Sequence, residues 1–73
     1  MGEAVETYFD DGVWRNRVGR RDALPGDYRT REAATKVGRN EARIRGVLHV
    51  VRREDGSVAE RRRYARRSEE LPG

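Results

Sequence analysis

Apolar and polar residues alternate on both sides of Asp11-Gly12, a pattern that predicts a β-hairpin over residues 4–18. Aspartate followed by glycine readily takes the positive φ angles of a tight two-residue turn. With that turn, the predicted cross-strand pairs are Val5 with Val18, Glu6 with Arg17, Thr7 with Asn16, Tyr8 with Arg15 and Phe9 with Trp14. Because a shift of one residue would turn Phe9 and Trp14 outward together, we expect this register to be well defined.

A loop and a helix follow the first hairpin. Residues 19–29 hold glycine and proline among charged residues and are predicted to form a loop, with Leu24 and Tyr28 as anchors to the core. Thr30 can cap the free amides at the start of a helix, and Gly46 can end it. We therefore expect a helix over residues 31–45.

The predicted helix has one apolar side. Ala33, Val37 and Ile44 lie within about 40° of one another on a helical wheel, and we expect this side to pack on the sheet. The opposite side carries Lys36, Arg39 and Arg43.

Glu41 interrupts the apolar side, where an unpaired carboxylate would be costly. We expect its side chain to reach the rim and pair with an arginine; a buried ion pair or a contact with another subunit is the alternative. Ala34, Gly38 and Ala42 form a row of small residues that would let another backbone approach closely. These three residues and Glu41 are the candidate subunit contact.

Residues 47–64 predict a second hairpin about Asp55-Gly56, with two possible registers. A two-residue turn, which we favour, places Val47, His49 and Val51 on one face with Val58 and Tyr64. A turn with a glycine bulge instead places Leu48 and Val50 on that face. Residues 65–73 offer only Leu71 for burial and are expected to form a loosely ordered tail.

The order of these elements predicts one α+β domain over residues 1–64, with ββαββ topology and a four-stranded antiparallel sheet. The helix would pack on one face of this sheet and leave the other face open. An open face and unpaired edge strands favour association, so a homodimer is the expected partner arrangement.

Composition limits the chemistry that the chain can perform. With 73 residues, no cysteine and one histidine, it offers no disulfide, no thiol nucleophile and no histidine cage for a metal. His49 and Glu60 could form an acid–base pair across the second hairpin, but no nucleophile or phosphate loop accompanies them. We therefore predict no enzyme activity, no cofactor or metal, and no small-molecule substrate. No apolar run is long enough to span a membrane, and the first residues lack a signal pattern, so we expect a cytoplasmic protein.

Positive charge gathers late in the chain. The net charge is +4, and all basic residues except Lys36 are arginine, which reflects either codon bias or the use of arginine for phosphate contacts. The second hairpin and the residues after it hold the candidate patch for nucleic acid or an acidic partner: Arg52, Arg53, Arg61, Arg62, Arg63, Arg66 and Arg67. Because successive strand residues point to opposite faces, these arginines cannot all contact one row of phosphates.

The whole chain resembles a family of short bacterial proteins known as domain of unknown function 2188. The resemblance rests on Val5-Glu6-Thr7-Tyr8, on Gly12, Trp14, Asn16 and Val18, on Thr30, Glu32-Ala33-Ala34 and Gly38-Arg39, and on Val50-Val51, Asp55-Gly56, Glu60-Arg61, Tyr64 and Pro72-Gly73. The chain departs from the family where Glu41 replaces a common methionine and where Tyr64-Ala65 replaces a tyrosine-glycine pair. The resemblance implies the fold and a bacterial origin, but no activity.

These observations together predict a small non-enzymatic bacterial domain that associates with itself or with another protein. The alternative function is weak, largely non-specific binding of nucleic acid through the arginine-rich hairpin.

Overall fold

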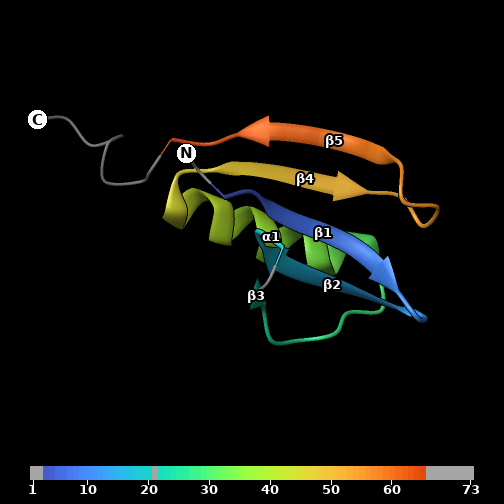
Figure 1. The fold of residues 1–73 in the computed structure, drawn as a ribbon. Helices are drawn as coiled ribbons and strands as arrows, with labels where there is room; N and C mark the ends of the chain where they lie inside the picture. The colour runs from blue at the N-terminus through green and yellow to red at the C-terminus, as the bar shows by residue number, and fades with distance from the viewer. Residues whose placement is uncertain (1–2, 21, 66–73) are drawn as a thin grey trace, which may run out of the picture.

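The computed structural model describes residues 3–20 and 22–65. One helix lies against one face of a single sheet (Figure 1). The elements in chain order are β1 (Val5–Asp10), β2 (Val13–Val18), β3 (Asp22–Ala23), α1 (Arg31–Arg45), β4 (Leu48–Arg52) and β5 (Val58–Arg63). The α+β class is therefore confirmed, with a short third strand added before the helix.

The first hairpin forms with the predicted register. Val5 faces Val18 and Phe9 faces Trp14, with Thr7 opposite Asn16 between them. Asp11 and Gly12 take φ angles of 49° and 86° in the turn, as a two-residue turn of this type requires.

The sheet is mixed, so the prediction of a purely antiparallel sheet is wrong. Its strand order is β3-β2-β1-β4-β5, and the central strands β1 and β4 run parallel. The cause lies in the connection between the hairpins. Residues 24–30 carry the chain along the sheet to the turn of the first hairpin, where Tyr28 bridges to Trp14, and α1 then returns it. As a result β4 starts beside the start of β1 and runs in the same direction (Figure 1).

The loop between β2 and α1 is anchored at the two predicted residues. Leu24 packs against the core, and the backbone of Tyr28 exchanges two hydrogen bonds with Trp14, of 2.7 and 2.9 Å. Ala23 of the two-residue strand β3 pairs with Arg17. The predicted loose tail lies, apart from Ala65, outside the described residues.

The second hairpin combines the two predicted registers. At the turn, Arg53 pairs with Ser57 around Gly56, whose φ of 93° marks the glycine-bulge form. The register then shifts between Val51 and Arg52, because Arg52 pairs with Val58 whereas Val51 pairs with Glu60. Ala59 is thus an extra residue on β5. It restores the register of the two-residue turn for the rest of the hairpin.

The helix begins and ends as predicted, but it packs on the sheet with a different side. The Thr30 side chain accepts a hydrogen bond of 3.1 Å from the Ala33 amide, and Gly46 ends the helix in the left-handed conformation. Val37 and Ile44 are 37% and 51% exposed, so the prediction that they face the sheet is wrong. The buried side consists of Ala34, Thr35, Gly38 and Ala42.

The buried side of α1 carries small side chains, and the sheet beneath it carries larger ones. The core cluster joins Val5 and Val18 of the first hairpin to Ala42 and Val47, with Leu24 and Tyr64 packed against it. Beside this cluster the sheet carries Trp14 and His49, which are 6% and 3% exposed. These bulky residues fill the space between the layers, so the helix contributes alanine and glycine there.

Candidate nucleic-acid interface

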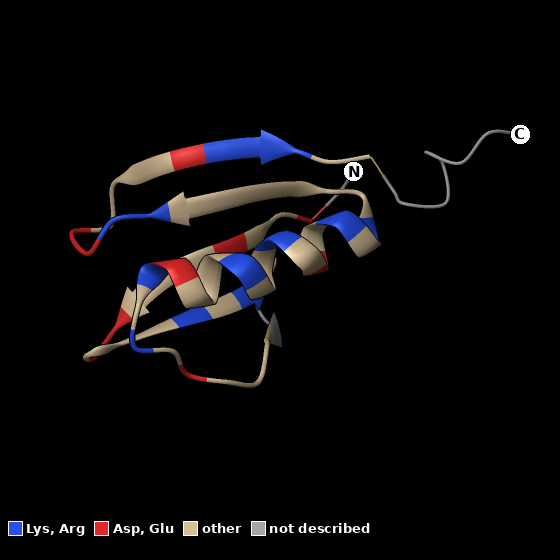
Figure 2. Ribbon diagram, turned by 180° about the vertical axis from the view of Figure 1, so that it is seen from behind, with Lys and Arg blue, Asp and Glu red and all other residues tan. Residues whose placement is uncertain are grey.

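A hollow lies between α1 and the edge strand β5. The helix packs against β1, β2 and β4, so β5 extends beyond the part of the sheet that α1 covers (Figure 2). The hollow has a volume of about 530 Å³ and Val51 in its lining. Its charged lining residues are Arg31, Glu32, Lys36, Arg39, Arg53 and Glu60.

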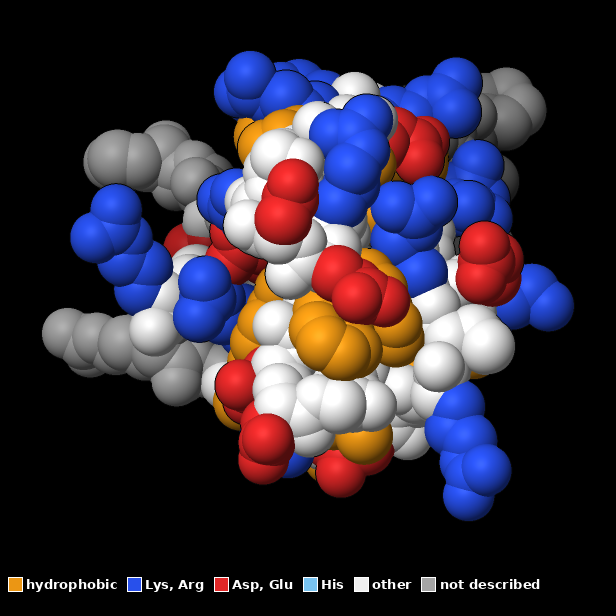
Figure 3. Space-filling view, turned by 90° about the vertical axis from the view of Figure 1, so that its right-hand side faces the viewer, with side chains coloured by type: hydrophobic (Ala, Val, Ile, Leu, Met, Phe, Trp, Pro, Cys, Tyr) orange, Lys and Arg blue, Asp and Glu red, His pale blue; other side chains and the backbone are white. Residues whose placement is uncertain are grey.

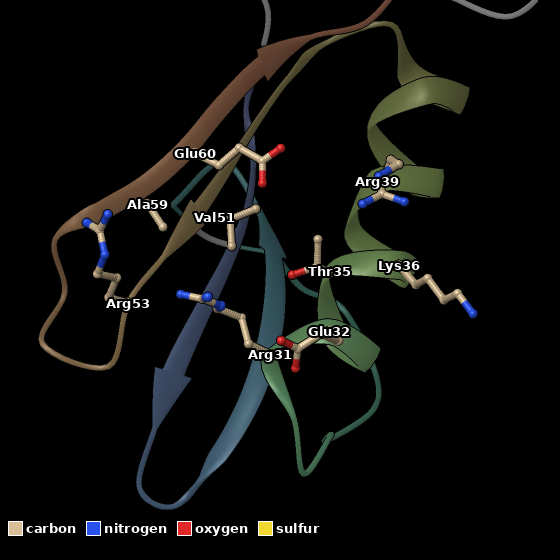
Figure 4. A pocket seen from close by; sticks show the side chains of 9 residues that line it. All are labelled: Arg31, Glu32, Thr35, Lys36, Arg39, Val51, Arg53, Ala59 and Glu60. Carbon is tan, nitrogen blue, oxygen red and sulfur yellow. The ribbon is translucent and has the colours of Figure 1, made fainter.

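The lining side chains come from both walls. Figure 4 shows that Arg31 extends from the start of α1 towards the second hairpin, where Arg53 stands, and that Glu60 points from β5 towards the helix. Lys36 points away from the hollow. Arg53 is held at the hairpin turn by a hydrogen bond of 2.8 Å to the Val58 carbonyl.

A second hollow of about 460 Å³ continues along the same side of the molecule. It is lined by Arg39, Arg43, Arg62, Arg63, Tyr64 and Ala65, so Arg39 borders both hollows. We call the two hollows together the cationic groove. Its basic residues that face the space between α1 and β5 are Arg31, Arg39, Arg43, Arg53 and Arg62.

Among the described residues, no arginine of the groove forms an ion pair with a carboxylate. Within residues 3–20 and 22–65, the ion pairs join Arg15, Arg17, Arg45 and Arg52 to carboxylates, and none involves a groove arginine. In the view onto the hairpin turns, basic side chains gather over the β4–β5 end, above an apolar area with carboxylates (Figure 3). An anion that entered the groove would meet guanidinium groups whose charge is not yet paired.

The open face of the sheet differs from the groove. There the Glu6 carboxylate lies between two guanidinium groups: Arg17 Nε donates to one oxygen at 2.6 Å and Arg52 Nε to the other. Burial raises the pKa of Glu6, but the hydrogen bonds from Arg52 and Arg17 outweigh burial and leave the pKa below its usual value. Val50 on the same face is only 9% exposed. Glu6 and its two arginines therefore occupy part of the face that was expected to be open.

The structure divides the predicted arginine patch between the two faces. Arg62 pairs with His49, whose side chain is buried beneath the helix, so Arg62 lies on the groove side with Arg53. Arg61 pairs with Val50 on the open face, which also carries Arg52, and Arg63 pairs with Leu48. Arg66 and Arg67 lie outside the described residues.

Sequence reasoning missed the contribution of the helix to this site. Lys36, Arg39 and Arg43 were predicted to lie together opposite the sheet, but Arg39 and Arg43 border β5 while Lys36 points away from the hollow. The strand order, which depends on the parallel pairing of β1 with β4, brings these two arginines and β5 together.

A buried polar network lies beneath the helix, between Gly38 and the sheet. Thr7 donates a hydrogen bond of 2.6 Å to Asn16 Oδ1, and Asn16 donates one of 2.9 Å to the Ala34 carbonyl. His49 Nε2 lies 2.8 Å from the Thr7 hydroxyl. Since that hydroxyl has already donated its proton, it accepts from His49, which fixes the ring proton on Nε2. Burial and the charge of Arg39 lower the pKa of His49, partly opposed by Glu60, so the ring is neutral at pH 7.

Most residues of the predicted subunit contact are buried against the chain's own sheet. Ala34 and Ala42 are fully buried, and Gly38 lies directly over the polar network. The close approach that this row permits is therefore made by the chain's own sheet. Glu41 is half-buried and pairs with Arg45 one turn later at 2.7 Å, as expected for a side chain that reaches the rim. Whether the protein forms a homodimer stays a prediction.

Among residues 3–20 and 22–65, no three His, Cys, Asp or Glu side chains are grouped closely enough to hold a metal ion. In the same part of the chain, no helix is long and apolar enough to cross a membrane.

Comparison with known proteins places the chain in a family without supplying an activity. No curated protein matches the chain. No solved structure matches it either. The family model described as "Uncharacterized protein conserved in bacteria (DUF2188)" matches residues 5–64, and the chain therefore belongs to this family.

Proposed function

We propose that the protein binds nucleic acid through the cationic groove, largely without sequence specificity. One observation carries this proposal. Arginines from two separate elements, α1 and the second hairpin, converge on one groove, and within the described residues none of them is paired with a carboxylate.

Phosphate is the anion that suits this arrangement. Guanidinium presents a planar fork of donors that matches two phosphate oxygens. Arg62 and Arg43 stand on opposite walls of the groove, and Arg39 borders both of its hollows. A phosphate chain that follows the groove can therefore meet several cations in succession, and release of its counterions would drive binding. Glu32 and Glu60 reduce the positive charge of the lining but are outnumbered by the basic residues.

The lining explains why we expect little sequence specificity. Bases are distinguished mainly by side chains that match their hydrogen-bonding edges: arginine for guanine, and asparagine or glutamine for adenine. The two hollows contain neither asparagine nor glutamine. Arginines that contact phosphates position a strand without reading its sequence.

Neighbouring arginines on β5 provide a matched test. Arg62 faces the groove and Arg61 faces the other side of the sheet, so Arg62→Gln and Arg61→Gln remove the same charge from adjacent positions. We expect Arg62→Gln to weaken binding to labelled DNA or RNA and to lower the salt slope by about 1. Arg61→Gln should leave both quantities close to those of the unchanged protein. Fluorescence anisotropy between about 50 and 200 mM salt measures them.

Equal effects of the two substitutions would contradict the proposal, because binding would then depend on net charge and not on the groove. Absence of binding at about 50 mM salt would contradict it as well. Arg39→Gln tests the helical wall independently, and it should resemble Arg62→Gln.

Self-association or protein binding is the second candidate function. It is favoured by the exposed Val37 and Ile44 on the outside of α1 and by the position of β5 at the edge of the sheet. Ala34, Gly38 and Ala42 no longer favour this function, because they are buried within the chain and are not available to another subunit. Light scattering at micromolar concentration tests this candidate: a dimer would support it, and a monomer would remove self-association.

A further inference from the structure

Tyr64 stands at the end of the cationic groove and is the aromatic residue in its lining. It borders the second hollow together with Arg39, Arg43 and Arg62. The volume of this hollow, about 460 Å³, falls within the roughly 300–1,000 Å³ that ligand pockets occupy.

The other four aromatic residues of the chain are engaged elsewhere. Phe9 and Trp14 contact each other, with ring centroids 5.1 Å apart, and Tyr28 is bridged to Trp14 through its backbone. Tyr8 lies on the open face under Arg17, whose guanidinium carbon is 4.6 Å from the ring centroid and whose side chain is paired with Glu6. Tyr64 lines a hollow whose arginines form no carboxylate pair within the described residues.

The Tyr64 ring is held in a fixed position. It is half-buried and packs against the core cluster of Val5, Val18, Ala42 and Val47. The Tyr64 amide donates a hydrogen bond of 3.2 Å to the Val47 carbonyl. A ring fixed in this way loses little conformational entropy when a ligand stacks on it.

Two guanidinium groups flank the ring. The guanidinium carbons of Arg43 and Arg62 lie 5.4 and 6.0 Å from the ring centroid. An arginine beside an aromatic ring presents a planar surface for stacking, while its N–H groups stay available to phosphate oxygens. The site thus offers planar surfaces for a base and donors for the phosphates on either side of it.

We propose that this end of the groove binds a nucleobase by stacking, so that the ligand is single-stranded nucleic acid. This inference rests on the proposed function and makes it more specific. Arg39, Arg43 and Arg62 hold the phosphates, and the Tyr64 assembly receives one unstacked base. Bases in a duplex are stacked on one another and are not free to enter the hollow.

Three ligands test the proposal on the unchanged protein. They are a short oligothymidylate, an oligomer of the same length with abasic residues in place of the nucleotides, and a duplex of the same length. One stacked base contributes roughly 1–3 kcal/mol, so we expect oligothymidylate to bind about fivefold or more tightly than the abasic strand. The duplex should bind no more tightly than the abasic strand when affinity is expressed per phosphate.

Variants then assign the effect to Tyr64. Tyr64→Phe retains a ring and should retain the preference for oligothymidylate. Tyr64→Leu should reduce that preference to about onefold while binding of the abasic strand is unchanged. Tyr8→Leu removes a tyrosine from the open face and should alter neither value. Circular dichroism establishes that each variant is folded.

The outcomes separate this inference from the proposed function. Equal affinity of the unchanged protein for the oligothymidylate and the abasic strand would overturn base stacking and leave groove binding intact. A preference that survives in folded Tyr64→Leu would overturn the role of Tyr64. If the unchanged protein binds none of the three ligands at about 50 mM salt, the proposed function itself fails.

Discussion

At Gly38, α1 lies in close contact with the sheet. A Cβ atom built there would lie 2.5 Å from Asn16 Oδ1, 2.6 Å from Thr7 Oγ1 and 2.7 Å from His49 Nε2. All three atoms belong to the buried hydrogen-bonded network, so none of them is the free end of a flexible side chain. The glycine therefore determines the spacing between the two layers.

We expect Gly38→Ala to destabilise the protein. In an exposed helix this substitution would stabilise by about 1 kcal/mol. Here the added methyl group overlaps the polar network, and overpacking together with strained hydrogen bonds should give a net loss of about 2 kcal/mol. Urea unfolding followed by Trp14 fluorescence measures the change. A gain in stability would show that the layers separate freely and that the close approach is not required.

At the scale of the element, the sequence predicts ends and turns better than it predicts faces. Thr30 and Gly46 bound the helix through local hydrogen bonds and backbone angles, which neighbouring residues determine. The same holds for the Asp11-Gly12 turn and the register that it sets. The buried side of α1 depends instead on a sheet assembled from distant segments, and there the wheel built on Val37 and Ile44 gave the wrong side.

The exposure of Ile44 has a measurable consequence. Because this side chain is 51% exposed, Ile44→Ala should change the free energy of unfolding by no more than about 0.5 kcal/mol. Val5→Ala, at a fully buried position, should cost about 2 kcal/mol. Both values come from denaturant unfolding at low protein concentration. A cost of 2 kcal/mol or more for Ile44→Ala that grows with protein concentration would instead identify Ile44 as a subunit contact.

The extra residue Ala59 shows a second limit of sequence-based prediction. Two registers of the second hairpin were compatible with the sequence, which favoured the two-residue turn, and the structure uses the glycine-bulge register at the turn and the favoured one beyond it. The bulge in β5 places Arg62 on the side of the sheet where His49 and Val51 of β4 face the helix. The groove could not be predicted from the sequence, because it forms only when the register shift in the second hairpin and the parallel pairing of β1 with β4 occur together.

At the scale of the whole molecule, His49 and Glu6 link stability to pH. The folded protein lowers the pKa of His49 through burial and Arg39, so below the usual pKa of 6.5 the unfolded chain binds a proton that the folded chain resists. The lowered pKa of Glu6 acts in the same direction below 4.5, where its pairs with Arg17 and Arg52 are lost on protonation. Stability should therefore fall as the pH falls, first below 6.5 and again below 4.5.

His49→Gln separates the two stages. Since His49 is the only histidine, this variant should lose the decline between about pH 6.5 and pH 5 and retain the later one. Denaturant unfolding at a series of pH values measures the slope. An unchanged slope in the upper range would exclude His49 as its source, whatever the variant's stability at pH 7.

The parallel pairing of β1 with β4 also bears on how the chain folds. Each hairpin closes over a short turn, but Thr7 meets His49 across 42 positions of sequence. Closing so long a segment costs conformational entropy before stabilising contacts can form. Such non-local pairing slows folding. We therefore expect the helix and the two turns to form early, and the core, the polar network and the groove to form together in a later step. Neither half of the chain is then expected to be a stable fragment.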